Sequence, residues 1–130
     1  MPIQVTAAII VRDHKILVAR RKPGSKQEGM WEFPGGKLDP NETPEACLKR
    51  EIEEELGIRD LVIERHWITT RHTYTFGEIE LMVYLCRSSS LPNKSDAHDA
   101  LEWATVSELS QYQWAPADIP AVQKLISEGI

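Results

Sequence analysis

The chain has 130 residues, of which 42% are hydrophobic and 27% are charged, a length and balance typical of one compact domain. Twenty acidic side chains against fifteen Lys and Arg give a net charge of -5, which argues against duplex nucleic acid and an anionic membrane surface as partners. We therefore expect one domain over residues 1–130, with room for a local basic patch.

Cysteine content and hydropathy predict the compartment. The two cysteines, Cys47 and Cys86, are too few for a disulfide framework and form no metal-binding CxxC pair. No apolar run approaches the ~20 residues that span a bilayer, and residues 1–5 lead into a strand-like pattern without the basic start of a secretory leader. These features predict a cytoplasmic protein that is neither exported nor anchored.

The N-terminal part of the chain predicts two strands, a loop and a bend. Small and β-branched apolar side chains fill Gln4–Val11, and a second apolar run, Ile16–Ala19, follows a short polar turn. Arg20–Met30 is polar, contains Pro and Gly and gathers positive charge, which predicts an ordered loop. Trp31–Phe33 then leads into Pro34–Lys37, where two glycines permit a tight bend.

A helix is predicted over Pro44–Leu56. Thr43 is a good N-cap, proline suits the first helical position, and Gly57 ends the run as a C-terminal cap. Apolar side chains that recur every four residues should form the buried stripe of this helix, and they are Leu48, Ile52 and Leu56.

The second half of the chain predicts further strands and a final helix. Apolar alternation is strongest over Glu78–Cys86, behind an expected hairpin turn at Phe76–Gly77. A polar loop is expected over Ser88–Ala100. The other expected elements are strands at Leu61–Glu64, Trp67–Tyr74 and Leu101–Ala104, a helical turn from Ser107 and a helix over Asp118–Ser127. Strands and helices without repeats indicate one mixed α/β domain.

Three glutamates project from one side of the predicted helix, since Glu51, Glu54 and Glu55 stand at i, i+3 and i+4. Like charges at these spacings repel by roughly 0.2 to 0.5 kcal/mol per pair, and the neighbouring apolar stripe adds desolvation. A positive group is therefore expected among them, and oxygen ligands without Cys or His favour Mg²⁺ or Mn²⁺. The alternative is a solvated acidic face, the usual role of a charge run.

The glutamates belong to a longer pattern of fixed spacing. A glycine is followed after five residues by Glu, and after seven more by Arg-Glu-apolar-any-Glu-Glu-any-Gly-apolar. The residues that fill it are Gly36, Glu42, Arg50, Glu51, Ile52, Glu54, Glu55, Gly57 and Ile58. This is the Nudix box without a mismatch, so the chain resembles a Nudix hydrolase. The segments around Trp31 and from Ala115 to Pro120 are most similar to the MutT branch.

The resemblance implies a fold and a set of roles. The fold is an α/β/α sandwich with a mixed β-sheet. Glu51, Glu54 and Glu55 would hold divalent ions together with the main-chain carbonyl of Gly35, and Glu54 is our choice for the general base. Arg50 and Glu42 would position the carboxylates. Arg21 corresponds to a phosphate-contacting arginine, and Lys37 would steady the loop or the phosphates. For the other cations of the loop, Arg20, Lys22 and Lys26, solvation is as good an expectation as phosphate contact.

One family residue is missing. The MutT branch has a further metal-binding glutamate a few residues before the tryptophan that matches Trp103, and Ala97 stands at that spacing here. Asp96 or Asp99 could replace it from an adjacent position, or water could fill the site.

The base pocket rests on Asp118, at the place where the branch has an asparagine that recognises oxidised guanine. An ionised carboxylate only accepts hydrogen bonds, which matches two adjacent donors of guanine. Cytosine would prefer a protonated acid or contact through its amine alone. Against this, the segment around Asp118 is similar to that of an enzyme that hydrolyses CTP and modified dCTP. The structural alternative for Asp118 is a helix N-cap. Aromatic side chains that could stack on a base, each also a core candidate, are Trp31, Phe33, Tyr74, Phe76 and Trp114.

The resemblance implies an enzyme, a Mg²⁺-dependent nucleoside triphosphate pyrophosphohydrolase that releases a nucleoside monophosphate and pyrophosphate. In this reading it cleans the nucleotide pool, with 8-oxo-dGTP as the first substrate and CTP, dCTP or 5-methyl-dCTP as the second. The glycine bend is no phosphate-binding Walker loop, because Leu38 replaces its Ser/Thr. The alternatives are a non-catalytic nucleotide-binding module and a hydrolase of another diphosphate. The expected partner is a small-molecule nucleotide, and the protein would be a monomer or homodimer.

Overall fold

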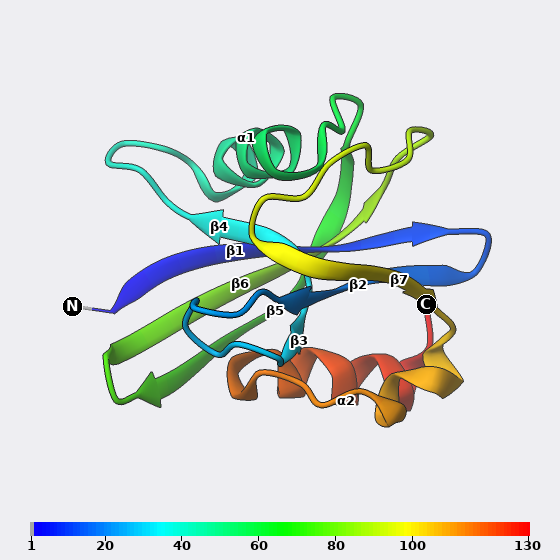
Figure 1. Cartoon of the computed structure of the whole chain (residues 1–130). Coiled ribbons are helices and arrows are strands. Elements are labelled where there is room, and N and C mark those ends of the chain that lie inside the picture. Colours follow the sequence, from blue (N-terminus) through cyan, green and yellow to red (C-terminus); the bar gives the residue numbers. More distant parts are fainter. Residues whose placement is uncertain (1) are drawn as a thin grey trace.

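The computed structural model describes residues 2–130, and these form a twisted β-sheet held between two helices (Figure 1). The strands, in chain order, are β1 (Ile3–Arg12), β2 (Lys15–Arg21), β3 (Trp31–Glu32), β4 (Gly35–Lys37), β5 (Val62–Tyr74), β6 (Gly77–Arg87) and β7 (His98–Ala104). The helices are α1 (Pro44–Leu56) and α2 (Ile119–Glu128), and two short 3-10 helices, η1 (Val106–Gln111) and η2 (Pro116–Asp118), precede α2. No helix among the described residues is long and apolar enough to cross a membrane.

The sheet is mixed, as predicted. The main strand order is β3-β2-β1-β6-β5, while β4 pairs with β1 and β7 pairs with β2. The long central pair, β1 with β6, is parallel, and the other pairs are antiparallel. Because β1 is central and apolar, its alternate side chains fill cores on both faces of the sheet.

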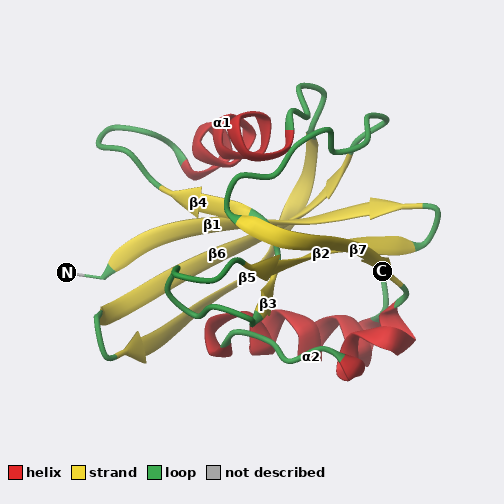
Figure 2. Ribbon diagram, in the orientation of Figure 1, coloured by secondary structure: helices red, strands yellow, loops and turns green. Residues whose placement is uncertain are grey.

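Each face of the sheet is covered by one helix (Figure 2). α1 buries Leu48, Ile52 and Leu56 against one face, in a cluster that includes Ala8 and Ile10 of β1. α2 and η1 cover the other face, where the buried side chains include those of Ile9, Trp67, Leu109, Val122 and Leu125. The arrangement confirms the α/β/α sandwich.

α1 has the bounds and caps that the sequence predicts. The Thr43 hydroxyl accepts a hydrogen bond from the Ala46 amide at 3.2 Å. Gly57 closes the helix in the left-handed conformation, with φ of 73°, which glycine adopts without steric cost. The helix therefore starts and stops at fixed residues, and this sets which side chains face the sheet.

Strand pairing extends several elements beyond their predicted ends. β7 begins at His98, inside the segment predicted as a polar loop, because Arg21 of β2 pairs with His98. The two strand segments expected on either side of Arg65 are one strand, β5, with irregular register between Ile63 and Arg65 and between His66 and Ile68. Local composition misses these residues since their extended conformation depends on a partner strand.

The predicted bend over Pro34–Lys37 is confined to Pro34, and Gly35–Lys37 is the short strand β4, antiparallel to β1. The glycines are needed for close approach. A Cβ on Gly35 would lie 1.9 Å from the Thr6 carbonyl oxygen, and one on Gly36 would lie 2.2 Å from the Glu51 carboxylate. β4 thereby brings a bare backbone against α1.

Candidate active site

The three glutamates of α1 that were chosen from the sequence have different surroundings. The side chain of Glu51 is 19% exposed and that of Glu55 is 13% exposed, whereas that of Glu54 is 61% exposed. Glu51 lies against Gly36, and Glu55 faces His98 of β7. Two of the three acids are therefore enclosed where the helix meets its neighbours, and Glu54 extends into solvent.

Arg50 supplies positive charge among these acids. Its Nε and Nη2 donate to the two carboxylate oxygens of Glu42 at 2.7 and 2.8 Å, and its Nη1 donates to Glu51 at 2.9 Å and to Glu54 at 3.2 Å. The hydrogen bonds from Arg50 and from the Asp39 amide lower the pKa of Glu42 to about 2. Arg50 thus ties three carboxylates together, in keeping with the positioning role expected for Arg50 and Glu42.

Glu55 receives no such help. Burial raises the pKa of Glu55 and of Glu51, because it disfavours the charged form. Glu51 is compensated by Arg50, but Oε1 of Glu55 is buried without a hydrogen-bond partner. An unpartnered carboxylate oxygen in a buried place is costly, and a cation is the simplest group that would satisfy it.

The donor set fits a hard divalent ion, although its members are not gathered around one point. No group of three or more His, Cys, Asp or Glu side chains within residues 2–130 converges on a common metal position. Glu54 is turned to solvent and bonded to Arg50, so it would have to leave Arg50 to join Glu51 and Glu55 around an ion. The oxygens on offer, those of carboxylates and a main-chain carbonyl, are the ligands that Mg²⁺ takes.

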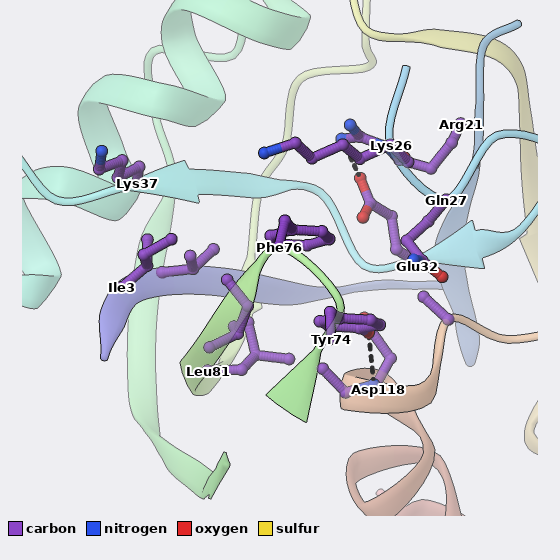
Figure 3. A pocket seen from close by; sticks show the side chains of 14 residues that line it. Ile3, Arg21, Lys26, Gln27, Glu32, Lys37, Tyr74, Phe76, Leu81 and Asp118 are labelled. Atoms are coloured by element: carbon purple, nitrogen blue, oxygen red, sulfur yellow. Dashed lines mark hydrogen bonds and ion pairs between the residues drawn. The ribbon is translucent and has the colours of Figure 1, made fainter. Parts of the chain in front are cut away.

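A cavity of about 420 Å³ opens beside this region (Figure 3). Arg21, Lys37 and Asp118, three residues chosen from the sequence, all line it. In the close-up, Tyr74 and Phe76 lie one above the other next to Asp118, while Arg21, Lys26 and Glu32 stand across from them. The cavity therefore has cationic side chains, an aromatic wall and a buried acid in one space.

Asp118 is 5% exposed, and its Oδ2 accepts a hydrogen bond from the Phe33 amide at 3.0 Å. Asp118 also stands at the N-cap position of α2, as the structural alternative predicts, but its side chain makes no capping hydrogen bond there. Burial raises the pKa of Asp118 well above its ordinary value, and the nearby negative charge of Glu32 raises it further. The pocket thus presents a carboxyl group that favours its neutral form.

The aromatic candidates separate into pocket and core. Tyr74 and Phe76 line the cavity, and their rings stack at 5.1 Å with 7° between the planes. Phe33 is 2% exposed, and its ring packs against Trp114 at 4.9 Å. Its expected stacking on a base is corrected: the alternation of the chain turns its ring into the core, and only its amide reaches the site. Trp31 packs edge-on against Tyr112 and does not line the cavity.

Arg21 enters the cavity from the end of β2. Its Nε donates to the Lys26 carbonyl at 2.9 Å, and its Nη1 donates to Glu32 at 3.3 Å. Lys26 in turn places its ammonium 4.2 Å from the centre of the Phe76 ring, across the mouth of the cavity. The basic loop is therefore ordered by its own contacts, and it holds two cations over the pocket.

The replacement expected for the missing family glutamate is not Asp99. That carboxylate is bonded to Arg20 at 2.7 Å. Asp96 lies near enough to Glu55 to raise its pKa, but the side chain that faces Glu55 directly is His98. Sequence reasoning missed His98 and Glu32. Signs of both were present: Glu32 belongs to the segment around Trp31 that is most similar to the MutT branch, and His98 follows Ala97 in a segment predicted as loop.

The comparisons with known proteins agree with this geometry. Residues 2–125 match the NUDIX domain. The chain is 40% identical over 126 residues to the CTP pyrophosphohydrolase of Escherichia coli, covering 96% of this chain and 92% of that one. It is 34% identical over 128 residues to the 8-oxo-dGTP diphosphatase of Haemophilus influenzae, covering 97% and 93%. The solution structure of the MutT protein of Staphylococcus aureus shares 45% identity and a TM-score of 0.81, covering 99% and 98%.

The fold, the acidic helix and these relatives define a class, that of hydrolases which act on nucleoside polyphosphates. The chain belongs to the Nudix hydrolase family, as the sequence resemblance implied. Enzymes of this family generally use divalent metal ions and act on small-molecule nucleotide substrates.

Proposed function

We propose that the protein is a Mg²⁺-dependent nucleoside triphosphate pyrophosphohydrolase, which converts a nucleoside triphosphate and water into the monophosphate and pyrophosphate. One observation carries the proposal most directly. The buried, unpartnered Oε1 of Glu55 stands on an acidic helix face, and a cavity with Arg21, Lys37 and Asp118 lies beside it. Divalent cations would neutralise the acidic helix face, and the phosphates of a nucleotide would pair with the basic side chains of the cavity.

In this proposal, Glu51, Glu54 and Glu55 hold the divalent ions together with the Gly35 carbonyl, and Mn²⁺ can replace Mg²⁺. When bound, such ions neutralise phosphate charge and lower the pKa of a bound water. Arg50 positions Glu51 and Glu54 through the hydrogen bonds described above. Glu54 is our choice for the general base, because it is the most exposed of the three and can reach a water molecule.

The polyphosphate is assigned to the cationic side of the cavity. Lys37 of β4 lines it on the side nearer α1, Arg21 lines it from the end of β2, and Asp118 lines it from η2 (Figure 3). A triphosphate bound by the two cations would extend from the acidic helix toward Asp118. The nucleoside would then lie beside Tyr74 and Phe76, whose stacked rings offer an apolar wall.

The burial of Asp118 and its hydrogen bond from the Phe33 amide support a different order of substrates from the one expected from the sequence. A neutral carboxyl can donate from one oxygen while the other accepts, whereas the preference for guanine assumed an ionised group. With Oδ2 engaged by the Phe33 amide, a proton on Oδ1 would suit the acceptor N3 of cytosine, and the 4-amino group could donate to the acid. We therefore place CTP, dCTP and 5-methyl-dCTP first and 8-oxo-dGTP second. The 40% identity to a CTP pyrophosphohydrolase supports the same order.

The test is a substrate panel with the purified protein and Mg²⁺, read by kcat/KM for dCTP, 5-methyl-dCTP, 8-oxo-dGTP and dGTP. We expect monophosphate and pyrophosphate from the cytosine nucleotides with the highest efficiency, and loss of activity with a chelator. Absence of hydrolysis for every nucleotide would contradict the proposed activity. A higher kcat/KM for 8-oxo-dGTP would contradict the base assignment and leave the activity standing.

The wider setting is also part of the proposal. All side chains assigned above come from one chain, so a monomer suffices for activity. A cytoplasmic location suits the free thiols of Cys47 and Cys86, and removal of unwanted nucleotides from the pool before replication is the role that the activity would serve there.

A further inference from the structure

His98 lies where the acidic helix and the nucleotide pocket meet. It is the first residue of β7, and its side chain is 2% exposed. Its Nε2 is 2.8 Å from Oε2 of Glu32, which lines the cavity, and its Nδ1 is 3.5 Å from Oε1 of Glu55 on α1. One buried ring thus touches an acid from each half of the site.

The partners of the ring assign its hydrogen. A carboxylate can only accept, and Oε2 of Glu32 already accepts from Arg21, so the short contact requires that Nε2 of His98 carries hydrogen and donates. The other ring nitrogen, Nδ1, lies 3.3 Å from the Ser95 hydroxyl.

Oε1 of Glu55 lies next to the ring without being hydrogen-bonded to it. The distance of 3.5 Å from Nδ1 is too long for a good hydrogen bond. Oε1 of Glu55 is, among the described residues, the one buried side-chain N or O atom with no hydrogen-bond partner. The ring fills the space next to this oxygen and at the same time leaves its charge unsatisfied.

We propose that His98 is a positioning residue: it fixes Glu32 by a hydrogen bond, and it packs against Glu55 while keeping Oε1 of that carboxylate free for a divalent cation. The inference rests on the proposed metal-dependent function. The pairing of His98 with Arg21 at the start of β7 places the ring between β3 and α1. Outer partners of metal ligands typically change affinity or activity by 10- to 100-fold.

The experiment compares His98→Ala, His98→Gln and a control, His66→Ala, in which an exposed histidine of β5 away from the cavity is removed. Mn²⁺ affinity of the nucleotide-free protein is measured by electron paramagnetic resonance, and kcat and KM are measured with the best substrate of the panel. Thermal unfolding reports whether each variant folds.

For His98→Ala we expect Mn²⁺ affinity and kcat to fall by roughly 10- to 100-fold. His98→Gln, whose amide can still donate to Glu32, should recover part of the loss, and His66→Ala should match the wild type. A general packing defect would not be rescued by glutamine.

The inference would be overturned if His98→Ala and His98→Gln both fold and keep Mn²⁺ affinity and kcat within twofold of the wild type. The proposed function would still stand in that case. If the wild type binds Mn²⁺ but hydrolyses no nucleotide, the proposed function fails, and the Mn²⁺ affinities alone decide the role of His98. Should His98→Ala not fold, His98→Leu, which fills the space of the ring but donates no hydrogen bond, takes its place in the same comparison.

Discussion

Neighbouring glutamates on α1 have very different environments, and single substitutions can separate them. Glu53 and Glu54 are both mostly exposed, with side chains 54% and 61% accessible, but Glu53 is paired only with Arg59 and Glu54 belongs to the Arg50 network. If α1 binds metal ions, substitution of Glu54 should reduce activity and substitution of Glu53 should not. If the helix face is only a solvated acidic surface, the two substitutions should have the same effect.

Glu54→Gln should lower kcat by roughly 10²- to 10⁴-fold, the range associated with loss of a general base, because the amide is a neutral and weaker base and ligand. Unfolding free energy should change by no more than about 0.5 kcal/mol, as for most exposed sites. Glu53→Gln is the matched control and should keep full activity. Steady-state kinetics and urea denaturation of both variants measure these effects, and equal activity of the two would remove Glu54 from the site.

The two glycines of β4 make a second contrast. Gly36→Ala would push a methyl group into the flexible carboxylate of Glu51, so activity should fall more than stability. Gly35→Ala would meet the Thr6 backbone carbonyl, which cannot move without disturbing β1, so stability should fall by about 1–3 kcal/mol or more. Denaturation and kinetics of the pair test this order. The account of close approach is wrong if Gly36→Ala retains the wild-type rate.

Asp118→Asn tests the neutral acid in the pocket. Because the folded protein raises the pKa of Asp118 above its ordinary value of 3.8, the folded state holds a proton that the unfolded chain releases above that pH. The free energy of unfolding of the wild type, relative to Asp118→Asn, should then decrease as pH rises from 3.8 and level off above the folded pKa. Urea denaturation over a pH series measures the difference, and a difference independent of pH contradicts a protonated Asp118.

Among the secondary-structure elements, α1 is the one whose bounds and buried face are predicted most directly by nearby residues. Thr43, Pro44 and Gly57 fix its ends, and the four-residue repeat fixes its buried face. These features act within a few residues, so they are visible without a partner. β7 and β4 are the opposite case: both are extended because a neighbouring strand pairs with them, and their composition alone predicts a loop and a bend.

The packing of α1 against the sheet should hold the site together. Ile52→Ala removes a fully buried side chain from the interface between the helix and the sheet, and we expect a loss of about 2–5 kcal/mol in the free energy of unfolding. Ile126→Ala, at an exposed position of α2, is the control and should cost far less. Urea denaturation compares them, and similar losses for both would contradict the assigned buried stripe.

For the whole molecule, the sequence predicts the layers and the acidic helix better than the pocket. Hydrophobic periodicity and capping residues predict α1 and several strands, and the family resemblance that the box motif carries implies the sandwich. The pocket joins residues from β2, β3, β4, β5, η2 and the basic loop, which only the folded sheet brings together. Phe33 shows the limit: its place beside the glycines suggests a stacking ring, but the strand turns that ring into the core and leaves its amide for Asp118.

The central claim is that the carboxylates of α1 bind divalent ions that hold a triphosphate in the adjoining cavity. A crystal structure with Mn²⁺ and a non-hydrolysable cytidine triphosphate analogue, with Mn²⁺ located by anomalous scattering, tests it most directly. We predict anomalous peaks bonded to oxygens of Glu51, Glu54, Glu55 and Gly35, with the phosphates next to Arg21 and Lys37 and the base beside Asp118. Ions and analogue bound away from α1, or an analogue bound without any ion at these carboxylates, would contradict the account.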